Sequence, residues 1–379
     1  MKELKEKIKV EIKRIFKEET EAGRFSVLKE EDVDLLAQIV MSELLIKKIK
    51  SENFRASDEH VERRKAELIF IAAPTGAGKD TLVRKISHDN PDRKYIILNM
   101  DMFRSYYVYF KKYLLERYPE GLTDRTFANQ TNGFSYEIYY TIQRLVLENF
   151  PGTDVIITGT IREIDWVEET FRVFKADPYT EYTTKMYGLA VPKKVCAISA
   201  IERYLYSIRV HAPGTARYVN AEYYSDTTDN YIKNFGYFEE LVASGSGVLD
   251  VIEVYRRSTR QNDFSEDTLL YSSDFSRMKC HNVTMTAKQI VAEIINYDAD
   301  IGLLKLASLL DRVAFMKEYL VGQDLYKEVL VAIYEFAPKE TGMRPSNAIE
   351  RQIENKMKSQ GTRVGEDDGE SGKYPGCDD

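Results

Sequence analysis

The chain has 379 residues, of which 43% are hydrophobic and 30% are charged, and it is long enough for one sizeable α/β domain with helical additions. The net charge of −7 at pH 7 argues against a general nucleic-acid-binding protein, because such proteins carry a strongly basic domain. Three cysteines that lie far apart in the sequence indicate neither a disulfide framework nor a metal knuckle.

The segment 1–58 is predicted to be helical and separate from the rest of the chain. Apolar residues recur at helical spacing in two stretches, from Leu4 to Ile15 and from Val33 to Ile49, and Gly23 interrupts the pattern between them. The first stretch is charged and amphipathic, unlike a secretory signal. No run in the chain approaches the roughly 18 apolar residues that a membrane span needs, so we expect a cytoplasmic protein without a membrane anchor.

Between residues 59 and 286, short buried strands alternate with helices. This alternation predicts an α/β domain with a mainly parallel sheet covered by helices on both faces. Strands are predicted at Leu68–Ala72, Tyr95–Asn99, Asp154–Thr158, Lys185–Val191 and Val248–Tyr255. Helices are predicted at Thr81–Ser87, Tyr136–Phe150, Ile164–Phe174 and Lys194–Ile208. Ligands of such sheets bind at the carboxyl ends of the strands, so residues that follow a strand are the first candidates for chemistry.

The stretch from Leu68 to Ile86 reads as a strand, a glycine-rich turn and a helix. In the turn, Pro74–Lys79, glycines let backbone N–H groups approach phosphate oxygens, and Lys79 adds a positive charge beside the N-terminal end of the helix. The pattern differs from Gly-x-x-x-x-Gly-Lys-Ser/Thr at Ala73 and Asp80. A glycine turn before a structural helix is the alternative. The predicted nucleotide-binding residues are Thr75, Gly76, Ala77, Gly78, Lys79, Asp80 and Thr81.

Two further strands end in residues suited to chemistry. Asp101 follows the strand Tyr95–Asn99, where a carboxylate can deprotonate an attacking hydroxyl or orient a metal ion, although a helix N-cap fits Asp101 equally well. The strand Asp154–Thr158 continues into Thr160 and Arg162, which can hydrogen-bond a ligand and pair with a phosphate. A βα turn with a capping threonine is the alternative for this segment.

Phosphoryl transfer needs cations beyond the loop lysine, because negative charge spreads over the oxygens of the transferring group. Arg203 on a predicted helix and Arg217 on the loop after that helix meet this need, although each also fits an ion-paired surface arginine. The four histidines are scattered, and no His/Cys cluster has the spacing of metal ligands.

In this order and at comparable spacing, these segments resemble the zeta toxin family, the P-loop kinases of bacterial toxin–antitoxin systems. The similarity spans about residues 66–275. Besides the phosphate loop, the matching segments are Asp101–Arg104, Gly159-Thr160 with Arg162, Ala190–Lys193, Ile201–Tyr204, Thr215–Arg217 and Leu270–Ser273. The resemblance implies a P-loop kinase-like fold and a reaction in which ATP and Mg²⁺ phosphorylate the 3′-hydroxyl of the amino sugar in UDP-N-acetylglucosamine.

The resemblance also implies roles for individual residues. Lys79 would hold the transferring phosphates, and Asp101 would be the general base. Arg203 and Arg217 would stabilise transition-state charge, and Thr160 would contact the sugar nucleotide. Further residues implied in substrate binding are Arg104, Thr158 and Arg162.

Three positions depart from the family pattern. Thr158 stands where the family has a substrate-contacting glutamate. A second family glutamate has no secure match, since Glu137 is the nearest carboxylate at a spacing several residues longer. Asp80 replaces a hydroxyl beside the triphosphate, which costs Coulomb energy unless Mg²⁺ lies between them and makes Asp80 a metal ligand. In adenylate-kinase-like loops the hydroxyl comes one position later, as Thr81 does here.

Three functions therefore stay open: a kinase for UDP-sugars, a kinase for another nucleotide, metabolite or antibiotic, and a nucleotide-binding switch that transfers no phosphate. The family resemblance implies an antitoxin partner, and residues 1–57 either replace it as an inhibitor in cis or form a structural appendage. Residues 287–358 are predicted to be helical without a functional motif, and residues 359–379 are predicted to be disordered.

Overall fold

The structure is a computed structural model that describes part of the chain. The described residues are 6, 8–10, 12–14, 65–99, 123–127, 132–149, 152–176, 181–210, 216–257, 268–274, 285–299 and 301–334. Asp101, Arg104, Thr215 and the predicted disordered tail therefore lie outside the described residues.

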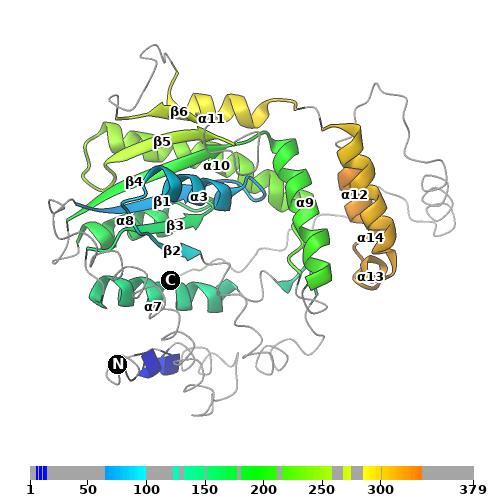
Figure 1. Cartoon of the computed structure of the whole chain (residues 1–379), viewed down its shortest axis with the longest axis horizontal. Helices are drawn as coiled ribbons and strands as arrows, with labels where there is room; N and C mark the ends of the chain where they lie inside the picture. Colours follow the sequence, from blue (N-terminus) through cyan, green and yellow to red (C-terminus); the bar gives the residue numbers. More distant parts are fainter. Residues whose placement is uncertain are drawn as a thin grey trace, which may run out of the picture.

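A six-stranded sheet forms the centre of the domain, in the order β2-β3-β1-β4-β5-β6 (Figure 1). Its strands are β1 (Ala66–Ala72), β2 (Ile96–Asn99), β3 (Val155–Gly159), β4 (Tyr182–Ala190), β5 (Val251–Arg256) and β6 (Leu269–Ser272). Neighbours from β2 to β5 are parallel, and β6 runs antiparallel to β5. The predicted mainly parallel sheet is confirmed, with each of the five predicted strands in place, whereas β6 was not predicted.

Helices cover both faces of the sheet, as the sequence predicts. Two of them, α3 (Lys79–Asp89) and the first turns of α9 (Lys193–Val210), pack on one face, where Ile69 and Ile71 of β1 lie. The other face carries α7 (Asn132–Asn149), α8 (Asp165–Lys175), α10 (Ala221–Ala243) and α11 (Ala287–Asn296). Each residue of β1 is buried, because a central parallel strand has helices on both sides.

The long helix α10 was not predicted. Its sequence contains threonines, asparagines and a glycine, which have low intrinsic helix propensity. Its aromatic residues Tyr231, Phe235 and Phe238 nevertheless recur at helical spacing and are buried against the sheet. Asn220 caps the helix, since its side chain accepts a hydrogen bond from the Tyr223 N–H at 2.8 Å.

The last described helices form a cluster beside α9. They are α12 (Leu303–Phe315), α13 (Lys317–Gly322) and α14 (Tyr326–Tyr334). Their apolar residues pack with Ile201, Tyr204 and Leu205 of α9 in a second buried cluster, which lies away from the sheet (Figure 1). This segment is helical as predicted, while the domain boundaries remain predictions.

Residues near the N-terminus contribute to the main core. The described residues between 6 and 14 are helical, in agreement with the predicted first helix. Ile8 and Ile12 lie one helical turn apart and are almost fully buried in the same cluster as the apolar residues of α7. Within the described part of the chain, no helix has both the length and the apolar character needed to cross a membrane.

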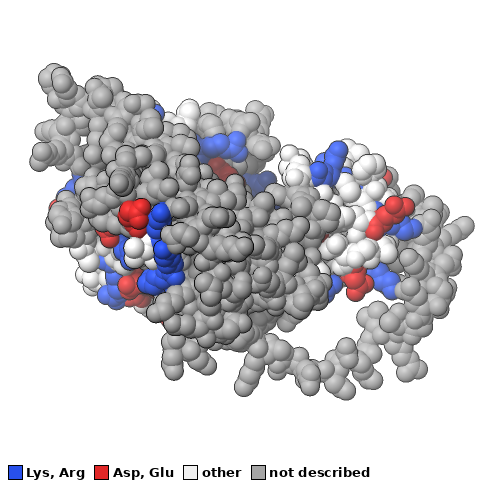
Figure 2. All heavy atoms as spheres, turned by 90° about the horizontal axis from the view of Figure 1, so that it is seen from below, with Lys and Arg blue, Asp and Glu red and all other residues white. Residues whose placement is uncertain are grey.

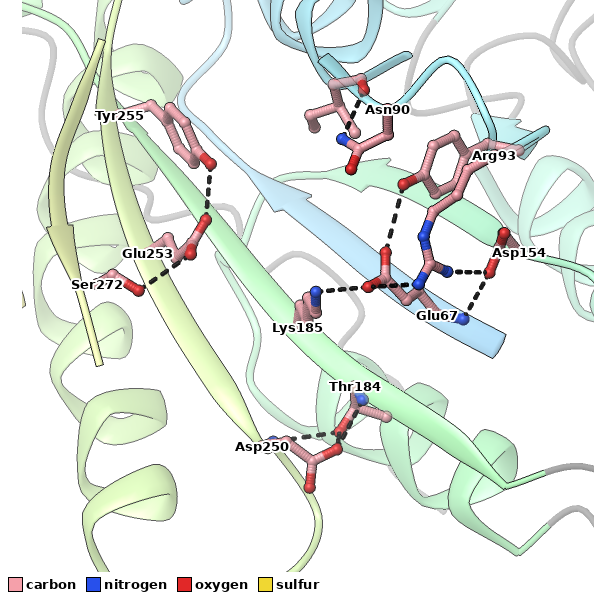
Figure 3. A network of polar contacts seen from close by, with 12 residues as sticks. Glu67, Asn90, Arg93, Asp154, Thr184, Lys185, Asp250, Glu253, Tyr255 and Ser272 are labelled. Atoms are coloured by element: carbon pink, nitrogen blue, oxygen red, sulfur yellow. Dashed lines mark hydrogen bonds and ion pairs between the residues drawn. The ribbon is translucent and has the colours of Figure 1, made fainter. Parts of the chain in front are cut away.

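A network of charged side chains stabilises the amino ends of the strands (Figure 3). The Glu67 carboxylate on β1 pairs with Lys185 at 2.6 Å and with Arg93 at 3.2 Å. Arg93 also pairs at 2.7 Å with Asp154, which accepts a hydrogen bond from the Glu67 N–H. These residues lie at the end of the sheet opposite the glycine-rich turn, so we interpret the network as structural. On the face in Figure 2, described Lys and Arg residues lie next to Asp and Glu.

Candidate active site

The glycine-rich turn connects the carboxyl end of β1 to the N-terminus of α3. Gly76 and Gly78 have φ angles of 81° and 97°. This left-handed backbone conformation is strained for any residue that carries a Cβ. Gly78 is the N-cap of α3, and no described side chain caps this helix end. Backbone N–H groups at this end therefore point toward the position where an anion would bind.

Ala73 replaces the first glycine of the loop pattern without opening the loop. Its side chain is fully buried in the cluster that contains Leu82 of α3 and Cys196 of α9. Its backbone N–H donates to the Gly159 carbonyl oxygen at 3.2 Å, which holds the start of the loop against the end of β3. The methyl group of Ala73 thus faces the core, and this departure leaves the rest of the turn in place.

The turn packs tightly against α9. A Cβ at Gly76 would lie 2.2 Å from the Cys196 carbonyl oxygen and 3.1 Å from the Ala200 nitrogen. Only glycine fits this contact, because Cβ atoms essentially never approach backbone atoms so closely. The loop and α9 are therefore held together backbone to backbone.

Lys79 and Arg257 lie on or beside this loop, and Arg203 lies further along α9. Lys79 Nζ donates to the carbonyl oxygens of Ala73 at 3.3 Å and Pro74 at 3.4 Å, so it lies along the loop. Arg257 follows β5 and donates to the Ser199 hydroxyl of α9 at 3.0 Å, and a Cβ at Gly78 would lie 3.7 Å from its Nε. Arg203 is exposed on α9, one turn beyond Ser199, and therefore shares the helix face that Arg257 contacts.

Arg257 was not among the residues predicted from the sequence. The rule that ligands bind at the carboxyl ends of parallel strands points to it, since Arg257 comes directly after β5 and two residues after the predicted strand Val248–Tyr255. Burial raises the pKa of the Cys196 thiol to about 11, and the positive charges of Arg257 and Lys79 act against this rise.

Asp80 and Thr81 lie in the first turn of α3. Asp80 is exposed, and its carboxylate offers the oxygen ligands that Mg²⁺ prefers. The Thr81 hydroxyl accepts a hydrogen bond from Arg84 at 3.4 Å. Among the described residues no group of three or more His, Cys, Asp or Glu side chains gathers as a metal site. A kinase magnesium ion needs only one or two carboxylates beside the phosphates, so Asp80 fits this requirement.

Thr158 lies at the carboxyl end of β3, next to Asn99 of β2 and Ile71 of β1. Its side chain is only 4% exposed, and its hydroxyl has no hydrogen-bond partner among the residues that the structure describes. Gly159 follows, and a Cβ there would lie 2.8 Å from Trp166 and 3.0 Å from Phe70. Packing therefore gives a sufficient reason for this glycine, in addition to the predicted approach of a ligand.

The turn after Thr158 is anchored by α10. The buried Asn234 side chain donates to the carbonyl oxygens of Ile161 and Arg162 at 2.7 and 2.8 Å. Arg162 pairs with Asp226 at 3.2 Å and lies over the Tyr223 ring at 5.4 Å. Arg162 is thus held at the N-terminal part of α10, and Thr160 is half-buried before it.

Arg217 lies in the segment between α9 and α10 and is half-buried. The structure brings the phosphate loop together with α9, the helix that bears Arg203, and it places Thr158 on β3, the strand beside β1. Asp101 and Arg104 follow β2, the strand beside Thr158, and lie outside the described residues.

The family model described as zeta toxin matches residues 51–269 of the sequence, more than half of the chain. The chain belongs to the zeta toxin family. Its mainly parallel sheet and its phosphate loop agree with this assignment, and the chain is a P-loop kinase that uses ATP. No protein with a curated description matches the sequence significantly.

Two solved structures are similar to the chain at low sequence identity. The chain is 17% identical to one from the PezAT chromosomal toxin–antitoxin system of Streptococcus pneumoniae, with 74% of this chain and 96% of that chain covered and a TM-score of 0.47. It is 10% identical to one in the AvrRxo1-ORF1:-ORF2 complex with ATP, where the coverage is 81% and 91% and the TM-score is 0.47. Both TM-scores are below 0.5, so the family assignment rests on the sequence match.

Two segments that resemble the zeta toxin family have structural roles in this member. On β6, Ser272 donates to the Glu253 carboxylate at 3.0 Å (Figure 3). Directly after β6, the Ser273 hydroxyl accepts from the Ile252 N–H at 3.0 Å. These contacts fix β6 against β5. Lys193, at the start of α9, donates to the Ser225 hydroxyl of α10 at 2.7 Å and joins those two helices.

Proposed function

We propose that this zeta toxin family kinase transfers phosphate from ATP to a sugar hydroxyl of UDP-N-acetylglucosamine or a related UDP-sugar. The contact between Gly76 and the backbone of α9 carries the proposal, because it joins the phosphate loop to the helix face that bears Arg203. Lys79 and Arg257 add two cations at the same loop. Such a concentration of positive charge suits a triphosphate whose terminal group is transferred.

In the proposed reaction, the acceptor hydroxyl attacks the γ-phosphorus and passes its proton to the Asp101 carboxylate. The bond between the γ-phosphorus and the bridging oxygen breaks, and ADP leaves with that oxygen. Lys79, Arg203 and Arg217 stabilise the charge that spreads over the phosphoryl oxygens. Asp80 would hold Mg²⁺, which neutralises charge on the β- and γ-phosphates when it is bound.

Thr158 supports an acceptor that forms a hydrogen bond at the end of β3. A buried hydroxyl without a partner carries a cost of about 1–3 kcal/mol, which an acceptor hydroxyl at that position would relieve. Thr160 and Arg162 lie on the same turn and are proposed to contact the sugar nucleotide, together with Arg104.

Thr158 also supports a second candidate, a kinase for a different acceptor. Threonine is neutral, so it accommodates a phosphate or carboxylate group that the glutamate of related family members would repel. An acidic metabolite or another nucleotide is the acceptor class in this case.

Mass spectrometry of acceptors incubated with protein, ATP and Mg²⁺ tests the proposal. A panel of UDP-sugars, nucleotides and acidic metabolites separates the two kinase candidates by which compound gains one phosphoryl group. Asp101→Asn is expected to abolish transfer and retain ATP binding, while Asp311→Asn, at an exposed position on α12, is the matched control. ATP binding without any phosphorylated product would identify a nucleotide-binding switch instead.

Residues 1–57 are proposed either to inhibit the kinase in cis, in place of a separate antitoxin, or to serve as a structural part of the domain. The burial of Ile8 and Ile12 in the main core favours the structural role. The variant Ile12→Asp distinguishes the two roles. Inhibition in cis predicts higher phosphotransfer and greater toxicity in bacteria, whereas a structural role predicts lower stability and lower activity.

A further inference from the structure

We propose that Asp124 and the helices α13 and α14 form a clamp that positions Arg217 for phosphoryl transfer. The inference rests on the proposed role of Arg217 and names the part of the chain that controls it. Arg217 lies in the short segment 216–220, which has no regular structure of its own to fix its position. The residues on either side of Arg217 are instead held by contacts from distant parts of the chain.

Asp124 is the centre of these contacts and is fully buried. One carboxylate oxygen accepts from the Ala216 N–H at 3.0 Å, and the other accepts from the Tyr204 hydroxyl at 2.9 Å and the Tyr319 hydroxyl at 2.8 Å. The backbone carbonyl oxygen of Asp124 accepts from the Tyr218 N–H at 3.1 Å. Asp124 therefore binds the backbone on both sides of Arg217.

The helices after the sheet hold Asp124 and its neighbour in place. The Gln323 side chain, which follows α13, accepts from the Asp124 N–H at 3.2 Å. Arg125 pairs with Glu328 of α14 at 2.7 Å and donates to the Asp324 carbonyl oxygen at 3.4 Å. Burial and the nearby Glu328 carboxylate raise the pKa of the Tyr218 hydroxyl. The loop at 123–127, the Arg217 segment and the two helices thus form one connected network.

Because this network is polar, it does more than fill space in the core, and we infer that it positions Arg217. An apolar side chain at position 124 would pack in the surrounding core without the cost of desolvating a carboxylate. The carboxylate has three donors with directional contacts, and one of them fixes the Ala216 backbone, while the Asp124 carbonyl oxygen holds the Tyr218 N–H. Such precision suits a group that must lie against the transferring phosphoryl, where a displacement of about 1 Å costs on the order of 100-fold in rate.

The clamp extends beyond the part of the chain that matches the family. The match ends at residue 269, and Tyr319, Gln323 and Glu328 all come later in the sequence. The kinase centre of this chain is therefore proposed to depend on a helical addition, to which the sequence alone assigned no role.

Tyr319→Phe tests the clamp, because it removes one hydrogen bond to Asp124 and keeps the ring. We expect kcat to fall about 10-fold or more, with the KM for ATP changed by less than about 2-fold, since the loss acts on the transition state. Tyr206→Phe is the matched control, because Tyr206 is 63% exposed on α9 and outside the network. If Tyr319→Phe proves unstable, Gln323→Ala is measured in its place.

A double variant shows whether Tyr319 acts through Arg217. In an Arg217→Ala background, the Tyr319→Phe change is expected to leave the remaining kcat unaltered, whereas a merely structural role gives multiplicative losses and overturns the proposal. Amide hydrogen exchange at 216–218 gives a readout independent of activity. Faster exchange in Tyr319→Phe than in Tyr206→Phe supports the clamp, and equal exchange overturns it. Wild-type turnover in Arg217→Ala would instead refute the proposed role of Arg217.

Discussion

Replacing Gly76 with alanine tests the contact on which the candidate site depends. The left-handed backbone at Gly76 costs a residue with a Cβ about 1–2 kcal/mol. The new Cβ would also lie 2.2 Å from the Cys196 carbonyl oxygen, and because that atom belongs to the backbone, either the loop or α9 must move. Overpacking of this kind costs about 1–3 kcal/mol more. We therefore expect Gly76→Ala to lose about 2–5 kcal/mol of stability.

Two other glycines separate backbone strain from the clash. Gly245 has a φ of 64°, and no atom lies within 4 Å of the position that its Cβ would take. Gly245→Ala is therefore expected to lose stability through backbone strain alone, by about 1–2 kcal/mol. Gly78→Ala is expected to lose the same amount, since the nearest atom, Arg257 Nε, lies at an ordinary contact distance of 3.7 Å. Gly78 lies in the phosphate loop, whereas Gly245 lies in the turn after α10.

Urea unfolding of the three variants measures these costs, and calorimetric titration with ATP measures binding. The expected order of stability places Gly76→Ala well below the other two. Gly76→Ala is also expected to lose ATP affinity, because the displaced loop no longer presents its N–H groups to the phosphates. If Gly76→Ala and Gly245→Ala unfold at the same urea midpoint, the predicted clash between the new Cβ and the α9 backbone is refuted. The loop would then not be packed on α9, and the argument that joins it to the Arg203 face would fail.

Three further predictions concern single side chains. Thr158→Val is expected to stabilise the ligand-free protein by about 1 kcal/mol in urea unfolding while raising the KM of the acceptor, and a loss of stability would contradict the buried, unpartnered hydroxyl. Burial raises the pKa of Cys196 from 9.0 to about 11, so the stability from its neutral thiol is complete below pH 9 and is lost as pH rises to 11. In the wild type the free energy of unfolding should therefore fall by about 2–3 kcal/mol over that range, and Cys196→Ala should remove this fall. Parallel pH profiles of the free energy of unfolding in the two proteins would contradict this. Asp324→Gly should raise the thermal midpoint slightly, since Asp324 has a φ of 55°, and a lower midpoint would show that the side chain is needed.

The parallel strands were predictable because each one is a short apolar run between polar or glycine-containing segments, and burial on both faces requires that pattern. The phosphate loop was predictable because glycine and lysine at fixed spacing have few other uses between a strand and a helix. In contrast, β6 is short and pairs only at an edge, and α10 combines weak helix formers with aromatic residues. Tertiary packing decides such segments, so their sequence gives little indication.

The same division applies to the candidate site. Residue type and motif order alone identified Lys79, Asp80, Arg203 and Arg217 as candidates. Arg257 was missed because an arginine at a strand end is common, and only its place above Gly78 and beside Ser199 distinguishes it.

The sequence by itself determined the family, the mainly parallel sheet and the phosphate-binding loop, because local spacing of apolar residues and glycines is sufficient for each. Only the tertiary structure decided which residues share a surface, since contacts between segments far apart in the chain depend on how the helices pack on the sheet. It joined the phosphate loop to α9 through Gly76, and it placed Asp124 between Arg217 and helices more than 100 residues later. No local pattern in the sequence predicts either contact.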